Sequence, residues 1–279
     1  MKKQRLRSIL FHTVAILLSL VMAYPLIWML SSSLKQSNEI FVSAHKLIPS
    51  TLHLENYTNG WKGMGGNSFG VYFSNSMLVS VTATIGAVLS SALVAFGFAR
   101  LDFRFKGFWF AVMMATMMLP EQILIVPQYI IFKAIGWTNT FLPLIVPFFC
   151  SMPFFVFLNM QFLRGIPIEL DEAAMIDGCS KLRVFFNILL PLSKSAIITS
   201  VIFSFYWRWQ DFLAPLIFLS KPEKYTFSVA IKMFSDPTVQ TDWGAMFAMA
   251  VVSLIPVCLV FALFQKYLVE GVATSGLKG

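Results

Sequence analysis

Long apolar stretches recur along the whole 279-residue chain and constrain its fold more than any other feature. A helix of about 20 apolar residues crosses the hydrocarbon core of a bilayer. Six stretches of this length lie near residues 9–30, 72–99, 108–132, 141–162, 196–219 and 243–267. Several contain proline or glycine, which membrane helices tolerate when their neighbours satisfy the freed backbone groups. The pattern predicts an all-α polytopic membrane protein with six transmembrane helices.

Charge is scarce throughout the chain. Charged residues make up 12% of the sequence and the mean hydropathy is +0.74, whereas soluble domains carry about 25% charge. Because apolar stretches extend from end to end, we expect one membrane domain over residues 1–279 and no soluble module. The formal charge of +8 is spread over the flanks of the stretches. Since no basic face results, nucleic-acid binding is not expected.

Lysine and arginine gather in three flanks, and this distribution predicts the orientation. The leading tail has Lys2, Lys3, Arg5 and Arg7. The connection after the second stretch has Arg100, Arg104 and Lys106, and the loop after the fourth has Arg164, Lys181, Arg183 and Lys194. Six spans place all three flanks on one side, which the positive-inside rule identifies as the cytoplasm. Both termini are therefore expected inside a cytoplasmic (inner) membrane, with residues 32–71 and 221–242 outside.

The first stretch also resembles a secretory signal, because it follows a basic tail. Its apolar run is longer than a signal usually has, and Tyr24, Pro25 and Trp28 stand where a small-residue cleavage site would be expected. We interpret it as a retained signal anchor. The three cysteines, Cys150, Cys179 and Cys258, have no spacing that indicates a metal site or a disulfide framework.

The loop over residues 164–192 is predicted to hold two short helices. Pro167 suits the start of the first, and Gly178 ends it. Three acidic residues occupy its first turns, where negative charge complements the helix dipole: Glu169, Asp171 and Glu172. A second helix is expected over 181–190. Both have apolar surface, which requires burial. The helices can fold back on the ends of their own spans, lie on lipid headgroups, or dock onto a separate protein.

The spacing in this loop resembles the EAA loop of ABC importer permeases, which inserts into a partner ATPase. The loop has Glu172, Ala173 and Ala174, three further residues, Gly178, nine further residues, and then Ile-Leu-Leu-Pro. In that family the small alanine pair and the glycine let the helix sit closely in a groove of the ATPase, and the glutamate meets basic or polar groups. The resemblance implies that these four residues form a coupling element, with Asp177 as an accessory.

The resemblance extends over nearly the whole chain. It includes residues 54–57 (LENY), 75–76 (NS), 99–101 (ARL), 118–120 (MLP), 136–140 (GWTNT), 209–212 (WQDF) and 271–279 (GVATSGLKG). Together these tracts are similar to the carbohydrate-importer permeases of the maltose type, specifically the shorter of the two unlike membrane subunits. One departure is that tract 209–212 more often reads Trp-Asn-Glu or Trp-Asn-Asp in that group.

The resemblance also implies partners. A second, unlike permease would complete the pore, an ATPase dimer would dock on the coupling helices, and an extracytoplasmic sugar-binding protein would touch segments 32–71 and 221–242. Residues 232–242 would enter the opened cleft of that binding protein. ATP and magnesium would be bound by the ATPase, because this chain has no G-x-x-x-x-G-K-[ST] phosphate loop. No cofactor is expected in the chain itself.

No enzyme active site stands out in the sequence. The chain has no H-E-x-x-H motif, and its histidines, His12, His45 and His53, fall in the first stretch and the outer loop. We therefore expect a transport subunit and no catalytic residues.

Polar side chains inside the predicted spans have two readings. Arg208 and Asp211 are three residues apart, within reach of each other on one helix face. They either form an ion pair that holds helices together or line the translocation path. The other candidates are either interhelical hydrogen-bonding groups or pore-lining groups: Asn75, Gln122, Gln128, Asn159 and Gln210. An ion-coupled secondary transporter is the alternative function, with Asp211 as its coupling carboxylate.

Overall fold

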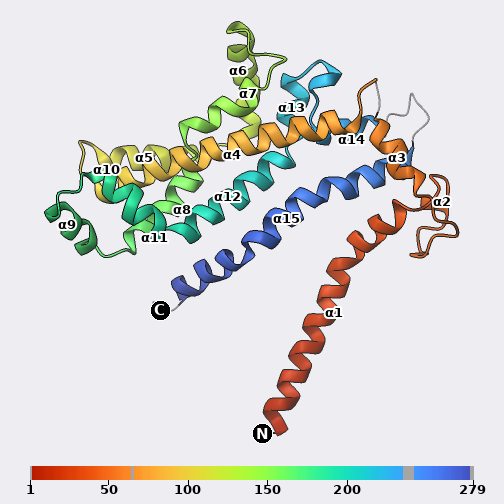
Figure 1. Ribbon diagram of the computed structural model, residues 1–279, viewed down its shortest axis with the longest axis horizontal. Coiled ribbons are helices and arrows are strands. Elements are labelled where there is room, and N and C mark those ends of the chain that lie inside the picture. Colours follow the sequence, from red (N-terminus) through yellow and green to blue (C-terminus); the bar gives the residue numbers. More distant parts are fainter. Residues whose placement is uncertain (1, 64–65, 235–241, 277–279) are drawn as a thin grey trace. The chain divides into compact units, whose positions relative to one another are not determined.

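The computed structural model consists of helices and connecting loops and describes residues 2–63, 66–234 and 242–276 (Figure 1). The longer helices are α1 (Lys2–Ser32), α3 (Glu55–Lys62), α4 (Phe69–Arg100), α5 (Lys106–Thr116), α6 (Glu121–Ala134), α8 (Pro153–Arg164), α9 (Glu169–Ile176), α12 (Lys194–Trp209) and α15 (Trp243–Gly276). The shorter ones are α2 (Glu39–Val42), α7 (Leu142–Ile145), α10 (Lys181–Val184), α11 (Leu190–Leu192), α13 (Leu213–Phe218) and α14 (Phe227–Met233). Since no β-strand occurs within the described residues, the predicted all-α class is confirmed.

The chain divides into two compact units. The first comprises residues 1–70 and 230–254, and the second comprises residues 71–229 and 255–279. The first unit holds α1, α2 and α3 with the start of α15, and the second holds most of α4, all of α5 to α13 and the rest of α15. Each unit has packing of its own.

Four stretches are long and apolar enough to cross a membrane. They are Leu6–Ser32, Phe69–Arg100, Leu142–Arg164 and Trp243–Tyr267. Two bent pairs reach the same standard jointly: α5 with α6, bent by 97°, and Lys181–Leu192 with α12, bent by 78°. By length and composition, the described part of the chain therefore has four helices that could cross a membrane, or up to six if each bent pair is counted as one.

The predicted third span, 108–132, is not one straight helix. α5 ends at Thr116, and α6 begins at Glu121 after a break that ends in Pro120. Pro120 is extended, with φ −61° and ψ 130°, and a proline disfavours helical geometry in the residue before it. Pro127, by contrast, lies inside α6. The bend is therefore at Pro120.

The predicted fifth span, 196–219, is also interrupted. α12 ends at Trp209, and α13 begins at Leu213. The Oδ1 atom of Asp211 accepts the backbone N–H of Ala214 at 3.3 Å. This contact satisfies one of the amides that the start of a helix leaves without an internal partner. Asp211 thus favours a new helix start at a place where hydropathy alone predicts continuity.

A buried cluster in the second unit joins the end of α4 to α8 and to the residues that follow α9. Its buried members are Ala92, Ala95, Phe96, Phe98, Val156, Met160, Leu163, Ala174, Val184, Phe185 and Leu189. The ring centroids of Phe96 and Phe185 lie 5.0 Å apart. Figure 1 shows α9 and α10 near one end of α4, and α13 lies near its other end. The packing of this cluster thus fixes the region around α9.

The first unit has a polar core at the end of α1. Lys35 is fully buried, and its Nζ atom donates to the carbonyl oxygens of Ser43, at 3.4 Å, and Lys46. The Nδ2 atom of Asn56 donates to the carbonyl oxygens of Ser33, at 2.9 Å, and Lys35, at 2.8 Å. A Cβ atom at Gly244 would lie 2.7 Å from the Asn56 side chain, so glycine allows α15 to approach α3 closely. The apolar window of α1 itself buries none of its side chains within the chain.

Candidate functional site

The candidate coupling residues lie on and just after α9. Glu169, Asp171 and Glu172 all lie in its first turn, where carboxylates offset the positive end of the helix dipole. The helix ends at Ile176, and Asp177 is its C-cap residue. Gly178 follows with φ +84°, a left-handed conformation that L side chains rarely adopt. The short helix and its glycine stop therefore form as the sequence predicts.

α9 has one face against its own chain and another exposed. Asp171 is 6% exposed and Ala174 is 8% exposed, and Ala174 belongs to the buried cluster around α4 and α8. The exposed residues are Glu172, Ala173, Met175, Ile176, Asp177 and Gly178. The two alanines of the predicted coupling element thus have different environments. Ala173 is available to a partner, and Ala174 is occupied within this chain.

Arg100, the last residue of α4, anchors α9. Its Nε atom lies 2.8 Å from Oδ2 of Asp171, and the two side chains are 7% and 8% exposed. Its NH2 group donates to the carbonyl oxygen of Ile166 at 2.8 Å, in the segment that leads into α9. The Nε contact is an ion pair without hydrogen-bond alignment, and Oδ1 of Asp171 is buried with no hydrogen-bond partner. The pair therefore depends on charge attraction in a buried site.

The sequence predicts neither partner of this pair as a site residue. Arg100 marks only a basic flank in the sequence, and Asp171 only a favourable charge for the helix dipole. Their contact joins residues far apart along the chain, and no local spacing signals it. The burial of Asp171 departs from the hydrophobic pattern of the loop.

Arg208, in the last turn of α12, is enclosed by three groups from the second unit. Its NH1 group lies 3.5 Å from Oδ2 of Asp211, and its NH2 group lies 4.0 Å from Oε2 of Glu121. Its guanidinium carbon lies 4.2 Å from the ring centroid of Phe148. The predicted contact between Arg208 and Asp211 is therefore present. The prediction that both residues lie on one helix face is wrong, because α12 ends between them and Asp211 lies outside the helix.

The other candidate pore residues have distinct environments. Asn159 is 1% exposed, and its Nδ2 atom donates to Oγ of Ser200 at 3.0 Å, which joins α8 to α12. Asn75 donates to the carbonyl oxygens of Glu223, at 2.9 Å, and Tyr225, at 3.0 Å. Gln122 and Gln210 are exposed, and Gln128 is half-buried. Within this chain, Asn159 is an interhelical hydrogen-bonding residue and does not face open space.

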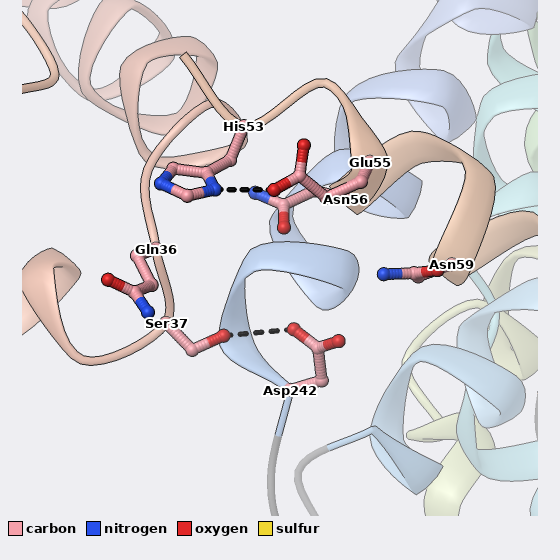
Figure 2. A pocket seen from close by; sticks show the side chains of 7 residues that line it. All are labelled: Gln36, Ser37, His53, Glu55, Asn56, Asn59 and Asp242. Atoms are coloured by element: carbon pink, nitrogen blue, oxygen red, sulfur yellow. Dashed lines mark hydrogen bonds and ion pairs between the residues drawn. The ribbon is translucent and has the colours of Figure 1, made fainter. Parts of the chain in front are cut away.

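A polar cavity of about 500 Å³ lies in the first unit. Figure 2 shows the residues that line it, which are Gln36, Ser37, His53, Glu55, Asn56, Asn59 and Asp242. Oγ of Ser37 donates to Oδ1 of Asp242 at 2.9 Å, and Nδ1 of His53 lies 2.5 Å from Oε1 of Glu55. The hydrogen bond from His53 lowers the pKa of Glu55 below its usual value. The lining offers amides, hydroxyls and carboxylates to a polar partner.

No set of three His, Cys, Asp or Glu residues that could hold a metal ion occurs in the described part of the chain. The cavity of Figure 2 includes His53, Glu55 and Asp242, which do not converge on one point.

Comparison with known proteins gives a consistent result. Residues 87–274 match the family described as "Binding-protein-dependent transport system inner membrane component". The chain is 36% identical over 261 residues to the probable ABC transporter permease protein YurM of Bacillus subtilis, covering 93% of this chain and 85% of that protein. It is 33% identical over 264 residues to the diacetylchitobiose uptake system permease protein NgcG of Streptomyces coelicolor, covering 94% of this chain and 86% of that protein.

A solved structure has the same fold. It is a crystal structure of a bacterial ABC transporter involved in the import of the acidic polysaccharide alginate. The TM-score is 0.81, and the match covers 96% of this chain and 98% of the other at 19% sequence identity. This likeness concerns the arrangement of the helices.

Proposed function

Because the chain belongs to the family of binding-protein-dependent transport system inner membrane components, we propose that it forms one half of the pore of a carbohydrate importer. It is a permease subunit of an ABC transporter and not an enzyme. Such a permease acts with a partner permease, an ATPase and a substrate-binding protein. The observation that carries the proposal is the family match over residues 87–274, which includes α9.

The proposed cargo is a carbohydrate. NgcG, one of the relatives described above, is named for the uptake of diacetylchitobiose. The family assignment favours ATP-driven import over the ion-coupled alternative. We propose that the second permease is an unlike subunit and that the binding protein is specific for sugars. Nucleotide and magnesium belong to the ATPase.

The exposed part of α9 is the proposed contact with the ATPase. Glu172, Ala173, Asp177 and Gly178 lie together on it, and Ile176, which is 86% exposed, adds apolar area. An apolar side chain so open to solvent favours burial against a partner. Ala174 lies on the opposite face of α9 and packs the helix against the buried cluster of its own chain. The arrangement combines two alternatives for the loop: it folds back on its own spans and also presents a face for docking.

The proposed topology has the six predicted spans, of which the third includes α5 and α6 and the fifth includes α12 and α13. In the proposed orientation both termini and α9 lie in the cytoplasm, and residues 32–71 and 221–242 lie outside a cytoplasmic membrane. The basic flanks support this orientation. In this orientation the residues that line the cavity around Ser37 and Asp242 belong to the outer segments, so the cavity is a proposed contact for the binding protein. Of the segment 232–242, which is proposed to enter the cleft of the binding protein, residues 235–241 lie outside the described residues.

The polar groups at the break between α12 and α13 are the proposed lining of the path. Arg208, Asp211 and Gln210 lie at that break, and Glu121 and the exposed Gln122 begin α6. Charged groups inside a membrane usually face a cavity or a partner. Asn75 lies beside the connection after α13, whereas Asn159 is proposed to hold helices together.

Purification of the tagged chain from gently solubilised native membranes tests the proposal. The wild type is expected to bring down a second permease and an ATPase. Glu172→Arg is expected to lose the ATPase, because the new charge lies on the exposed face of α9, and to keep the second permease. Asp102→Arg is the matched control, since Asp102 is an exposed acid on the flank after α4. Recovery of the wild-type chain alone, with uptake intact in Glu172→Arg, would refute the importer proposal.

A further inference from the structure

We propose that Arg100 is a positioning residue that ties α9 to α4, so that α4 transmits the movement of α9 to the segment 223–227 near its other end. The inference rests on the proposed function, because it takes α9 as the helix that the ATPase moves. The residues that would transmit the movement are the ion pair of Arg100 and Asp171, helix α4, and Asn75 with Ser76.

Arg100 attaches the end of α4 to α9. Its guanidinium contacts both Asp171 of α9 and the carbonyl oxygen of Ile166, which precedes α9. Both charged side chains are more than nine-tenths buried. Separating a buried pair leaves an uncompensated charge in a poorly solvated place, which is strongly unfavourable. α9 can therefore move only together with the end of α4.

α4 is continuous between its two ends. It runs unbroken from Phe69 to Arg100 over 32 residues without an internal proline, which corresponds to a length of about 48 Å at ~1.5 Å per residue. Half of its apolar window is buried within the chain. In the same unit, α5 with α6 and residues 181–192 with α12 are sharply bent. A straight, packed helix transmits a displacement that a broken one would absorb.

The other end of α4 is attached to the segment 223–227. The Nδ2 atom of Asn75 donates to the carbonyl oxygens of Glu223, at 2.9 Å, and Tyr225, at 3.0 Å. The backbone N–H of Phe227 donates to Oγ of Ser76 at 2.8 Å. The next turn back adds Phe73, whose ring centroid lies 5.3 Å from that of Trp209 at the end of α12.

Through these contacts, a displacement of α4 would reach the break between α12 and α13. Trp209 also stacks on Phe227, with ring centroids 4.6 Å apart. Ser228 Oγ donates to the carbonyl oxygen of Asp211 at 2.6 Å. The segment held by Asn75 and Ser76 is thus bonded to the residues at which α12 stops. A displacement of Asp171 is therefore transmitted to Asp211 through packed and hydrogen-bonded groups, all within one compact unit.

The experiment measures this transmission without needing the substrate. Cys150, Cys179 and Cys258 are replaced by serine, and Glu223→Cys, at an exposed position, serves as the reporter. The complex with its co-purified ATPase is placed in lipid nanodiscs and labelled with a maleimide, without nucleotide and with ATP plus orthovanadate. The parent complex is expected to change its labelling rate about fivefold or more, a typical coupling factor. In Arg100→Asp and Asp171→Arg the ratio of the two rates is expected to fall to about one.

Three further variants separate transmission from loss of structure. The double variant Arg100→Asp, Asp171→Arg restores opposite charges and is expected to recover most of the ratio. Asn75→Ala leaves α9 untouched and is expected to lose the ratio while the ATPase stays bound. Arg104→Ala, which removes an exposed arginine from the same flank, is expected to behave as the parent.

The outcomes keep the two proposals apart. A parent complex without an ATPase contradicts the proposed function. A parent complex that holds the ATPase but shows no nucleotide response at position 223 overturns the inference. So does a full response in Arg100→Asp or Asn75→Ala, or a double variant that is no better than its single variants.

Discussion

Arg100 and Asp171 form a buried ion pair between the last residue of α4 and the first turn of α9, with Nε and Oδ2 2.8 Å apart. Both side chains are almost completely removed from solvent. Glu172, the next residue along, is exposed. Two adjacent carboxylates on one short helix therefore have different environments: Asp171 is paired within the chain, and Glu172 is open to solvent.

Asp171→Ala is expected to destabilise the chain by about 3–5 kcal/mol, because it leaves the Arg100 guanidinium buried without its counter-charge. Glu172→Ala is the control and should change the free energy of unfolding by no more than ~0.5 kcal/mol, since its side chain is exposed. Unfolding of the purified chain in mixed micelles by increasing SDS, followed by tryptophan fluorescence, measures both. Equal effects of the two substitutions would contradict the assignment of the pair.

Ala174→Leu and Ala173→Leu are expected to fail in different ways. Ala174 lies in the buried cluster, so the larger side chain should overpack it at a cost of about 1–3 kcal/mol. Ala173 is exposed, so the same substitution should leave stability unchanged and reduce recovery of the ATPase. The same unfolding and co-purification assays separate these results. Loss of the ATPase without destabilisation in Ala174→Leu would show that this residue also faces the partner.

Gly178→Ala should destabilise the end of α9, because φ at this position is +84° and a Cβ atom makes that conformation strained. The expected cost is about 1 kcal/mol or more. Gly97→Ala is the matched control: Gly97 lies inside α4, where a Cβ atom would meet nothing within 4 Å, and alanine favours helix by about 0.5–1 kcal/mol. Unfolding midpoints should move in opposite directions, and a common direction would refute this explanation of the turn.

The carboxyl of Glu55 should titrate below the usual range, chiefly because His53 hydrogen-bonds to it. A depressed pKa in the folded chain contributes stability that is present above the unfolded value of about 4.3 and is lost as the pH falls through the folded value. His53→Ala should move the pKa of Glu55 back up toward its usual value. The pKa of Glu39, which is lowered by Ser50, should stay unchanged. Carbon NMR of labelled glutamate carboxyl groups follows both, and an unmoved Glu55 would contradict this cause.

Apolar length and turn chemistry predict much of the fold. Four of the apolar stretches overlap the four helices of spanning length, and the third stretch overlaps α5 and α6. The fifth stretch overlaps α12 and α13, whereas the bent pair in that region consists of residues 181–192 and α12. Gly178 stops α9 as expected. The breaks before Glu121 and after Trp209 are not predicted, because hydropathy reports the composition of a segment and not its direction. Pro120 is a signal for the first break. For the second break, the cap provided by Asp211 becomes evident only from the contact with Ala214.

The inward face of α9 is the part of the site that the sequence could not predict. An apolar pattern favours burial of Ile176 over Asp171, yet Ile176 is 86% exposed and Asp171 is 6% exposed. Arg100 reverses the expected order, because it supplies a counter-charge from a distant part of the chain. Patterns that rest on neighbouring residues do not detect a partner of this kind.

The division of α9 into an inward and an outward face has a consequence for how such a permease could come to pair with a different ATPase. Positions 171 and 174 are constrained by Arg100 and by the buried cluster around α4 and α8, and hence by this chain alone. Positions 172, 173 and 176 are free of that constraint. On the proposed assignment of this face to the ATPase, substitutions on the outward face alone are expected to match the permease to a different ATPase. Natural variation should show 171 changing together with 100, and 172 and 173 changing together with the ATPase.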